Sequence, residues 1–212
     1  MSINILFWMK KIDYKNNLSL TKDGRNLRSV KTQASIVNSA TDLFLQSKSL
    51  EWPTAEQIAK HSGVGLRTVY RQFDDMDGLV QACHKKFMIE LKSKFIIEVP
   101  ILNKIQDRIN FLIKERIKIY DKYKYVFSYT ISKFQKSSIL MNGLIEANIK
   151  LRERFENIVP EIKNMSLIDQ AFLDAMIAFP SWYRLSSHYK FSNDKIINKF
   201  TLQTIKLINQ KD

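Results

Sequence analysis

The sequence predicts an all-α protein of about nine helices, with a small three-helix unit near the N-terminus followed by a larger helical bundle. Two observations lead to this prediction. The 212 residues include only 5 Gly and 4 Pro, which leaves few obligatory turns. Apolar side chains also recur at steps of three and four residues along most of the chain, as they do in amphipathic helices. With 45% hydrophobic residues, the chain can bury one substantial core or two unequal ones.

The first predicted helix runs from Ser29 to Ser47. Its apolar side chains recur at steps of three and four residues at Ala34, Val37, Ala40 and Phe44, and Ile36 and Leu43 widen the stripe. Before it, residues 1–22 show no sustained period and are interpreted as an N-terminal extension. Whether that extension is ordered stays open.

A cytoplasmic protein with no membrane partner is expected. The short apolar patch at the start is followed by its basic residues, and no small-residue cleavage site appears, so we predict no signal peptide. No stretch approaches the ~20 apolar residues that a membrane span needs. The single cysteine, Cys83, excludes an intramolecular disulfide.

The second predicted helix, Ala55 to His61, has a clear start and a clear end. Thr54 follows Pro53 and precedes Gln57 by three residues, which is the pattern of a capping box. After the helix, Gly63 can adopt the left-handed conformation that ends it, and Val64 can return to the core.

The third predicted helix, from about Leu66 to Phe73, has two different faces. At ~100° per residue, Val69 and Phe73 share one stripe, while Arg67 and Arg71 point the opposite way. Two short helices joined by a glycine-containing turn form the element that places a helix in the DNA major groove. Arg can bind guanine or phosphate, and Gln can bind adenine. The alternative is an ordinary solvated face on a short basic helix.

Three segments resemble the N-terminal domain of TetR-family transcriptional regulators: QASIVNSATDLF, TAEQIAKHSGVGLRTVYRQF and DDMDGL. From the first segment to the last, the match spans about a quarter of the chain. The positions that match the family pattern are Ile58, Ala59, Gly63, Val64, Thr68, Tyr70, Phe73 and Leu79.

The resemblance implies a set of DNA contacts. Thr54, Thr68 and Tyr70 are expected to bind phosphate, with Ala55 beside Thr54 at the start of the second helix. The expected base or backbone contacts are Arg67, Arg71 and Gln72. Leu66 could face the bases by family position or the core edge by helical periodicity, and both alternatives stay open. Three positions depart from the family pattern: Glu56, Gly65 and Met76.

A fourth helix is predicted from the acidic cap at Asp74–Asp77 to near Pro100. Helical periods then return in residues 101–120, 123–136, 139–158, 167–188 and 192–208, and Pro180 is expected to kink its helix. The predicted domains are the extension 1–22, a helix-turn-helix domain 23–80, and an effector-binding and dimerisation domain 81–212.

The resemblance implies that this last domain dimerises and binds a small effector. The dimer-interface candidates are Phe179, Trp182, Ile196, Phe200 and Ile205, with an intramolecular core as the alternative. The effector-pocket candidates are Arg108, Phe111, Tyr120, Tyr123, Phe127 and Trp182, with Arg116 as a further acid-binding group. Here too, ordinary core packing is the alternative.

An enzyme is not expected, because the sequence contains no GxxxxGK[ST], HExxH or GxSxG motif. Cys83 and His84 are adjacent and diverge on a helix, so we expect no metal site there and no cofactor. The net charge of +13 suits a polyanionic partner. The predicted function is a homodimeric regulator that binds a palindromic double-stranded operator and is released by a small-molecule effector. The alternative is a helical interaction module with weak, non-specific DNA binding.

Overall fold

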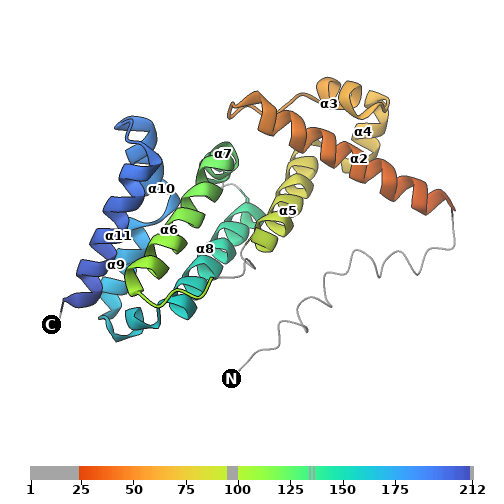
Figure 1. The fold of residues 1–212 in the computed structure, drawn as a ribbon. Helices are drawn as coiled ribbons and strands as arrows, with labels where there is room; N and C mark the ends of the chain where they lie inside the picture. The colour runs from red at the N-terminus through yellow and green to blue at the C-terminus, as the bar shows by residue number, and fades with distance from the viewer. Residues whose placement is uncertain (1–23, 95–99, 134, 136, 211–212) are drawn as a thin grey trace. The chain divides into compact units, whose positions relative to one another are not determined.

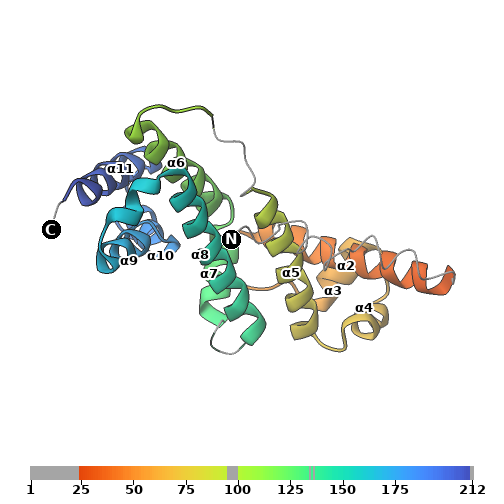
Figure 2. The same ribbon diagram turned by 90° about the horizontal axis from the view of Figure 1, so that it is seen from below.

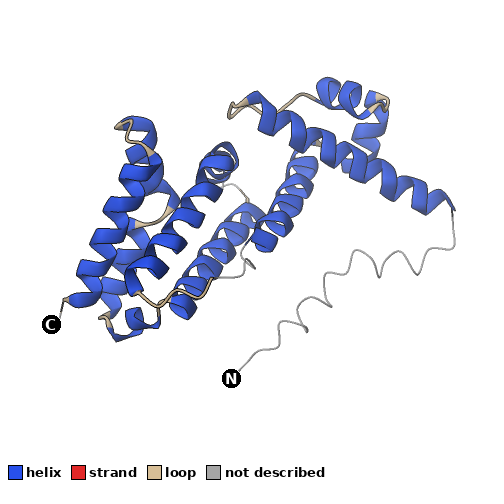
Figure 3. Ribbon diagram, viewed as in Figure 1, coloured by secondary structure: helices blue, strands red, loops and turns tan. Residues whose placement is uncertain are grey.

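The computed structural model describes residues 24–94, 100–133, 135 and 137–210, and this part of the chain forms helices and no strand (Figure 3). It divides into two compact units. The N-terminal unit comprises Trp52–Cys83 and the described residues before Ser47. The C-terminal unit comprises Ser47–Glu51 and the described residues from His84 on. The predicted extension, residues 1–22, lies outside the described residues.

The N-terminal unit contains α2 (Gly24–Ser47), α3 (Ala55–Ser62), α4 (Leu66–Phe73) and the first part of α5 (Met76–Lys94) (Figure 1). Helix α2 begins at Gly24, earlier than the predicted Ser29. The first turn of α2 is mostly exposed to solvent. It has no apolar stripe, and the predicted start depended on such a stripe. The Arg28 Nε donates a hydrogen bond to the Gly24 carbonyl at 3.1 Å and supports this turn.

The four helices of the N-terminal unit share one hydrophobic core. Each contributes two buried side chains to it: Ile36 and Ala40 from α2, Ile58 and Ala59 from α3, Val69 and Phe73 from α4, and Leu79 and Cys83 from α5. The Cys83 thiol also donates to the Val37 carbonyl at 3.7 Å. This core fixes the short helices α3 and α4 relative to α2.

The C-terminal unit is a helical bundle. Its helices after α5 are α6 (Ile105–Lys122), α7 (Lys124–Lys133), α8 (Ser138–Ile158), the 3-10 turn η3 (Pro160–Asn164), α9 (Leu167–Met176), α10 (Phe179–Tyr183), the π-helical turn η4 (Arg184–His188) and α11 (Asn193–Asn209). Helix α11 packs along α6, and the two lie side by side in both views (Figures 1 and 2). No helix among the described residues is long and apolar enough to cross a membrane.

The single helix predicted over residues 167–188 is wrong, because the structure divides that segment into α9, α10 and η4. Helix α9 ends at Met176, and α10 begins at Phe179 with Pro180 in its first turn. Proline lacks an amide hydrogen and clashes with the preceding turn, so it begins a helix more readily than it continues one. Ser181 Oγ donates to the Ala175 carbonyl at 2.7 Å across the break. The apolar period continues through this break, so periodicity indicated one helix. Pro180, which was expected to kink that helix, instead lies in the first turn of a new one.

Aromatic rings form the centre of the C-terminal unit. Tyr120 and Trp182 are 2% and 1% exposed, with their ring centroids 5.8 Å apart. Phe127 and Phe179 stack at 4.9 Å beside them. The Trp182 Nε1 donates to Asn193 Oδ1 at 3.0 Å, which satisfies its one polar group. This packing ties α6, α7 and α10 together.

His84 of α5 is buried against α8 within the C-terminal unit. A Cβ added at Gly143 would lie 2.4 Å from the His84 Nε2, so only glycine allows this approach. The Nε2 is buried and has no hydrogen-bond partner among the described residues. Burial lowers the pKa of His84 from 6.5 to about 4, because the charged imidazolium is poorly solvated there.

This buried histidine should make the protein less stable in mild acid. Since the pKa of His84 is lower in the folded chain, the unfolded chain takes up the proton first, and stability is lost as pH falls from 6.5 towards 4. Between pH 7 and pH 5, we expect His84 to reduce the free energy of unfolding by about 1 to 2 kcal/mol. Urea unfolding of the wild type and of His84→Leu at both pH values measures it. An equal loss in the two proteins would contradict the assignment.

Candidate nucleic-acid interface

The start of α3 and the turn that follows α3 are fixed by local signals that the sequence correctly predicted. Thr54 Oγ1 accepts a hydrogen bond from the Gln57 amide at 3.3 Å, and Gln57 Oε1 accepts one from the Thr54 amide at 2.8 Å. Gly63 ends α3 with φ 71°, in the left-handed region. The Val64 amide then donates to the Ala59 carbonyl at 3.1 Å. The predicted capping box and glycine turn are confirmed.

Helix α4 has one buried and one open face. Val69 and Phe73 are 1% and 7% exposed and pack in the core of the N-terminal unit. Arg67, Tyr70 and Arg71 are exposed. The two-faced helix predicted from the sequence is therefore confirmed, and its open face carries two guanidinium groups and a phenol.

Leu66 lies in the first turn of α4 and is 38% exposed. The sequence allowed two positions for Leu66, at the edge of the core or on the open face of α4. In the structure its side chain is partly accessible to solvent. Gly65 precedes it as the N-terminal cap without a side-chain hydrogen bond. The start of α4 consequently leaves backbone amides free for an anionic partner.

Gln72 of α4 is hydrogen-bonded to Ser29, a residue for which the sequence predicted no role in the DNA-binding surface. Its amide forms hydrogen bonds of 3.2 Å with the Ser29 hydroxyl of α2. The two residues are 43 positions apart, so no local pattern could reveal the contact. The first turns of α2 thus belong to the same surface as α4, and Arg28 is exposed one residue before Ser29.

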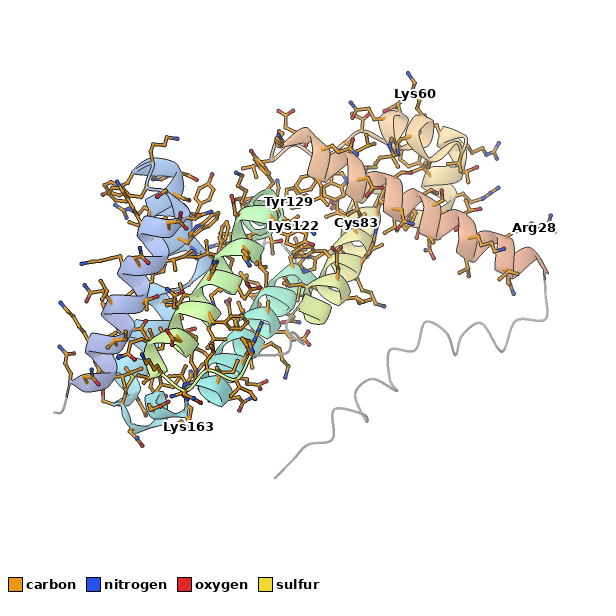
Figure 4. All side chains as sticks on the ribbon, viewed as in Figure 1. Arg28, Lys60, Cys83, Lys122, Tyr129 and Lys163 are labelled. Carbon is orange, nitrogen blue, oxygen red and sulfur yellow. The ribbon has the colours of Figure 1, made fainter. Side chains whose placement is uncertain are left out.

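The start of α3 contributes both a hydroxyl and a carboxylate to this surface. Thr54 and Glu56 are exposed, whereas the Ala55 side chain is only 4% exposed, so Ala55 can reach a partner only through its backbone. The pKa of Glu56 is lowered by hydrogen bonds from its own backbone amide and from Thr54. A negative charge therefore sits next to Thr54 at neutral pH. Figure 4 shows the Lys60 side chain further along α3, pointing away from the helix.

Met76 is one of the three positions that depart from the family pattern, and the structure shows what its side chain contacts. Met76 is half-buried and packs against the core of the N-terminal unit. The residue therefore extends the apolar core under α4 and offers no charge to a phosphate.

Most of the predicted effector-pocket residues pack in the core of the C-terminal unit. Tyr120, Tyr123, Phe127 and Trp182 are all 5% exposed or less, and Phe111 is half-buried. The Arg108 guanidinium donates to Glu161 and to the Ile158 carbonyl. The burial of these side chains is what the alternative of core packing predicts, and their role in an effector pocket stays a prediction.

The predicted dimer-interface residues also lie mostly inside one chain, and a role for them in an interface stays a prediction. Phe179, Trp182, Ile196 and Phe200 are buried within one chain, and Ile205 is half-buried. The exposed apolar side chains of the same region lie elsewhere on α9 and α11: Leu167, Ile168, Phe172 and Leu202. Periodicity identified these helices as apolar but did not show which of their faces the chain itself covers.

Comparison with solved structures shows a similar arrangement of helices in two regulators. A TetR-family transcriptional regulator of Streptomyces coelicolor superimposes with a TM-score of 0.63 at 13% identity, covering 82% of this chain and 81% of that one. Another, from Mesorhizobium loti, gives a TM-score of 0.62 at 14% identity, covering 85% and 96%. The chain has the fold of the TetR-family transcriptional regulators. The fold that the resemblance implies, a helix-turn-helix followed by a helical bundle, is thereby confirmed.

The chain is also similar in sequence to a transcriptional regulator. A helix-turn-helix transcriptional regulator of Staphylococcus aureus is 28% identical over 178 residues, which cover 79% of this chain and 88% of the relative. No protein-family profile matches the chain. All three of these proteins are named as transcriptional regulators.

The turn that positions α4 gives a testable prediction on two neighbouring glycines. Gly63 has φ 71°, where a side chain is strained, whereas Gly65 has φ −71° and open space around it. We expect Gly63→Ala to lower the free energy of unfolding by about 1 kcal/mol and Gly65→Ala by only a few tenths. Chemical denaturation of both variants measures the difference. Equal effects would show that the left-handed turn is not what holds α4.

Proposed function

We propose that this protein is a sequence-specific DNA-binding transcriptional regulator that inserts α4 into the major groove. One observation carries the proposal. The buried face of α4 is anchored by Val69 and Phe73, while its opposite face presents Arg67 and Arg71 to solvent. A short helix held in this way after a tight turn is the recognition element of helix-turn-helix proteins.

The side chains around α4 divide by the part of DNA that they suit. Arg67 and Arg71 can pair with guanine or neutralise phosphates. Thr54, Thr68 and Tyr70 carry hydroxyls that suit phosphate oxygens, and the amide of Ala55 lies at the start of α3, where helix dipoles favour anions. Gln72 can reach adenine only by exchanging its hydrogen bond with Ser29.

A homodimer on a palindromic operator completes the proposal. Leu167, Ile168 and Phe172 of α9 are 80%, 75% and 60% exposed, and α9 contacts α11, which carries the exposed Leu202. A second copy that covers these side chains would remove a large apolar surface from water. Two-fold symmetry would then present two α4 helices to two half-sites.

The proposed regulation is release from the operator when a small effector binds the C-terminal unit. The likeness to TetR-type regulators supports it. A repressor that works in this way needs only a difference in effector affinity between its DNA-bound and free conformations.

A second candidate function is a helical interaction module that binds DNA weakly and without sequence preference. The observations that favour it are the Glu56 carboxylate beside Thr54 and the packing of Met76 into the core. Binding that weakens with salt but does not differ among sequences would support this module over a specific regulator.

Removing the α4 cations should abolish specific binding. We expect Arg67→Ala and Arg71→Ala each to weaken operator binding about ten- to a hundredfold, because each loses a base or phosphate contact. The control is Lys163→Ala, an exposed cation of η3 in the C-terminal unit, which should bind as the wild type does. Mobility-shift titrations on DNA flanking the protein's own gene provide the measurement. Unchanged binding by both arginine variants would rule out α4 as the reading helix.

Removing the Glu56 charge should strengthen binding. The carboxylate is ionised at neutral pH beside a residue proposed to contact phosphate, so it repels the DNA backbone. We expect Glu56→Gln to raise affinity several-fold at low salt, with a smaller gain at high salt. Glu153→Gln, on the exposed surface of α8, is the matched control. Fluorescence anisotropy at two salt concentrations tests it, and an affinity that falls or stays constant would contradict it.

A further inference from the structure

Two arginines of the C-terminal unit line the same small cavity. The cavity lies between α6 and α8, and its lining residues are Leu112, Arg116, Ile119, Leu151, Arg154 and Phe155. Four of these are apolar and the other two carry positive charge. A mostly apolar wall with a few converging polar groups is typical of small-molecule sites.

Arg116 is almost completely buried, at 6% exposure. Its Nη2 donates to the Leu151 carbonyl at 2.9 Å, and its guanidinium carbon lies 5.8 Å from the centre of the Phe155 ring. Its ion-pair partner, Asp174, is 4.0 Å from the Nη1, at the outer limit of an ion pair, and is 40% exposed. The charge of Arg116 is therefore only partly compensated by the protein.

Arg154 is less well compensated. Its Nη2 is buried and has no hydrogen-bond partner among the described residues. Burial lowers the pKa of Arg154, the carboxylate of Glu115 raises it, and the positive charge of Arg116 lowers it. Glu115 is itself bound to Lys118 at 2.6 Å. A buried cationic donor without a partner is costly, and its presence calls for an explanation.

We propose that Arg116 and Arg154 bind the carboxylate of a small acid whose apolar part lies against Leu112, Ile119 and Phe155. A carboxylate accepts two parallel hydrogen bonds from a guanidinium, and it would satisfy the free Nη2 of Arg154. The inference rests on the proposed regulation by an effector and names the chemical class of that effector.

The cavity also indicates how the ligand enters. It has room for about one water molecule, which is less than a carboxylate needs. Arg116 is fixed by Leu151 and Phe155, whereas Arg154 is only half-buried and has no such anchor. Binding therefore requires the Arg154 side chain to move outward and close again on the anion.

The test uses the thermal unfolding of the full-length protein. The variants are Arg154→Met, which keeps the apolar stem and removes the charge, and the control Arg152→Met. Arg152 lies on the same helix, is 48% exposed and is paired with Glu156 at 2.8 Å. In sodium chloride, we expect Arg154→Met to raise Tm by about 2–4 °C because it removes an uncompensated charge, with no rise in Arg152→Met.

Sodium butyrate is then compared with sodium chloride plus butyramide at the same ionic strength. Butyrate should raise the Tm of the wild type and of Arg152→Met, and this rise should disappear in Arg154→Met. Two results would overturn the site. One is a fall in Tm for Arg154→Met in chloride larger than that for Arg152→Met, which would make the guanidinium structural. The other is a butyrate effect that is absent from the wild type or equal in all three proteins.

A separate measurement distinguishes this inference from the proposed function. Operator binding by the wild type is titrated with and without butyrate. If butyrate stabilises the protein through Arg154 and leaves DNA affinity unchanged, the acid site stands and the proposed release mechanism fails. If the protein binds no specific DNA at all, the proposed regulator fails and the thermal result still decides the site.

Discussion

A helix of eight residues is unstable by itself in water, and α4 depends on the burial of Val69 and Phe73 for its existence. These two side chains pack among residues from α2, α3 and α5, so three other helices are needed to keep α4 helical. Because one face supplies the stability, the other face is free to carry charged and polar groups. The capping box at Thr54 and the left-handed turn at Gly63 then fix the direction in which that face points.

The arginines of the two units differ in how far they are exposed to solvent. In the N-terminal unit, Arg67 and Arg71 are exposed on α4, whose opposite face packs in a hydrophobic core. In the C-terminal unit, Arg116 is enclosed among apolar and aromatic residues, and Arg154 has a buried nitrogen without a partner. Exposed cations suit a long polyanion that arrives from solvent, whereas enclosed cations suit a single small anion that has shed its water. Each arrangement matches the kind of ligand proposed for it.

Local features of the N-terminal unit could be read from the sequence because their causes are local. The capping box needs only Thr54 and Gln57, and the end of α3 needs only Gly63. The two faces of α4 follow from a single period over eight residues. The confirmed predictions are of this kind.

The remaining features depend on contacts between distant parts of the chain. The exposed start of α2 gives no apolar signal, and the partner of Gln72 lies 43 residues away. Phe179 and Phe200 belong to apolar stripes, but periodicity does not say whether the same chain or a second copy covers them. Arg154 was not identified for the same reason, since only packing reveals that its Nη2 lacks a partner.

In the proposed regulator, the contact between Ser29 and Gln72 would limit how strictly one operator position is read. A base that offers the Gln72 amide no better partner leaves it on Ser29, where its hydrogen bonds are already satisfied. A different base at that position leaves no polar group without a hydrogen bond. The loss of binding free energy is then only the small difference between two neutral hydrogen bonds. Such a position tolerates sequence variation, and natural operators would be degenerate at that base pair.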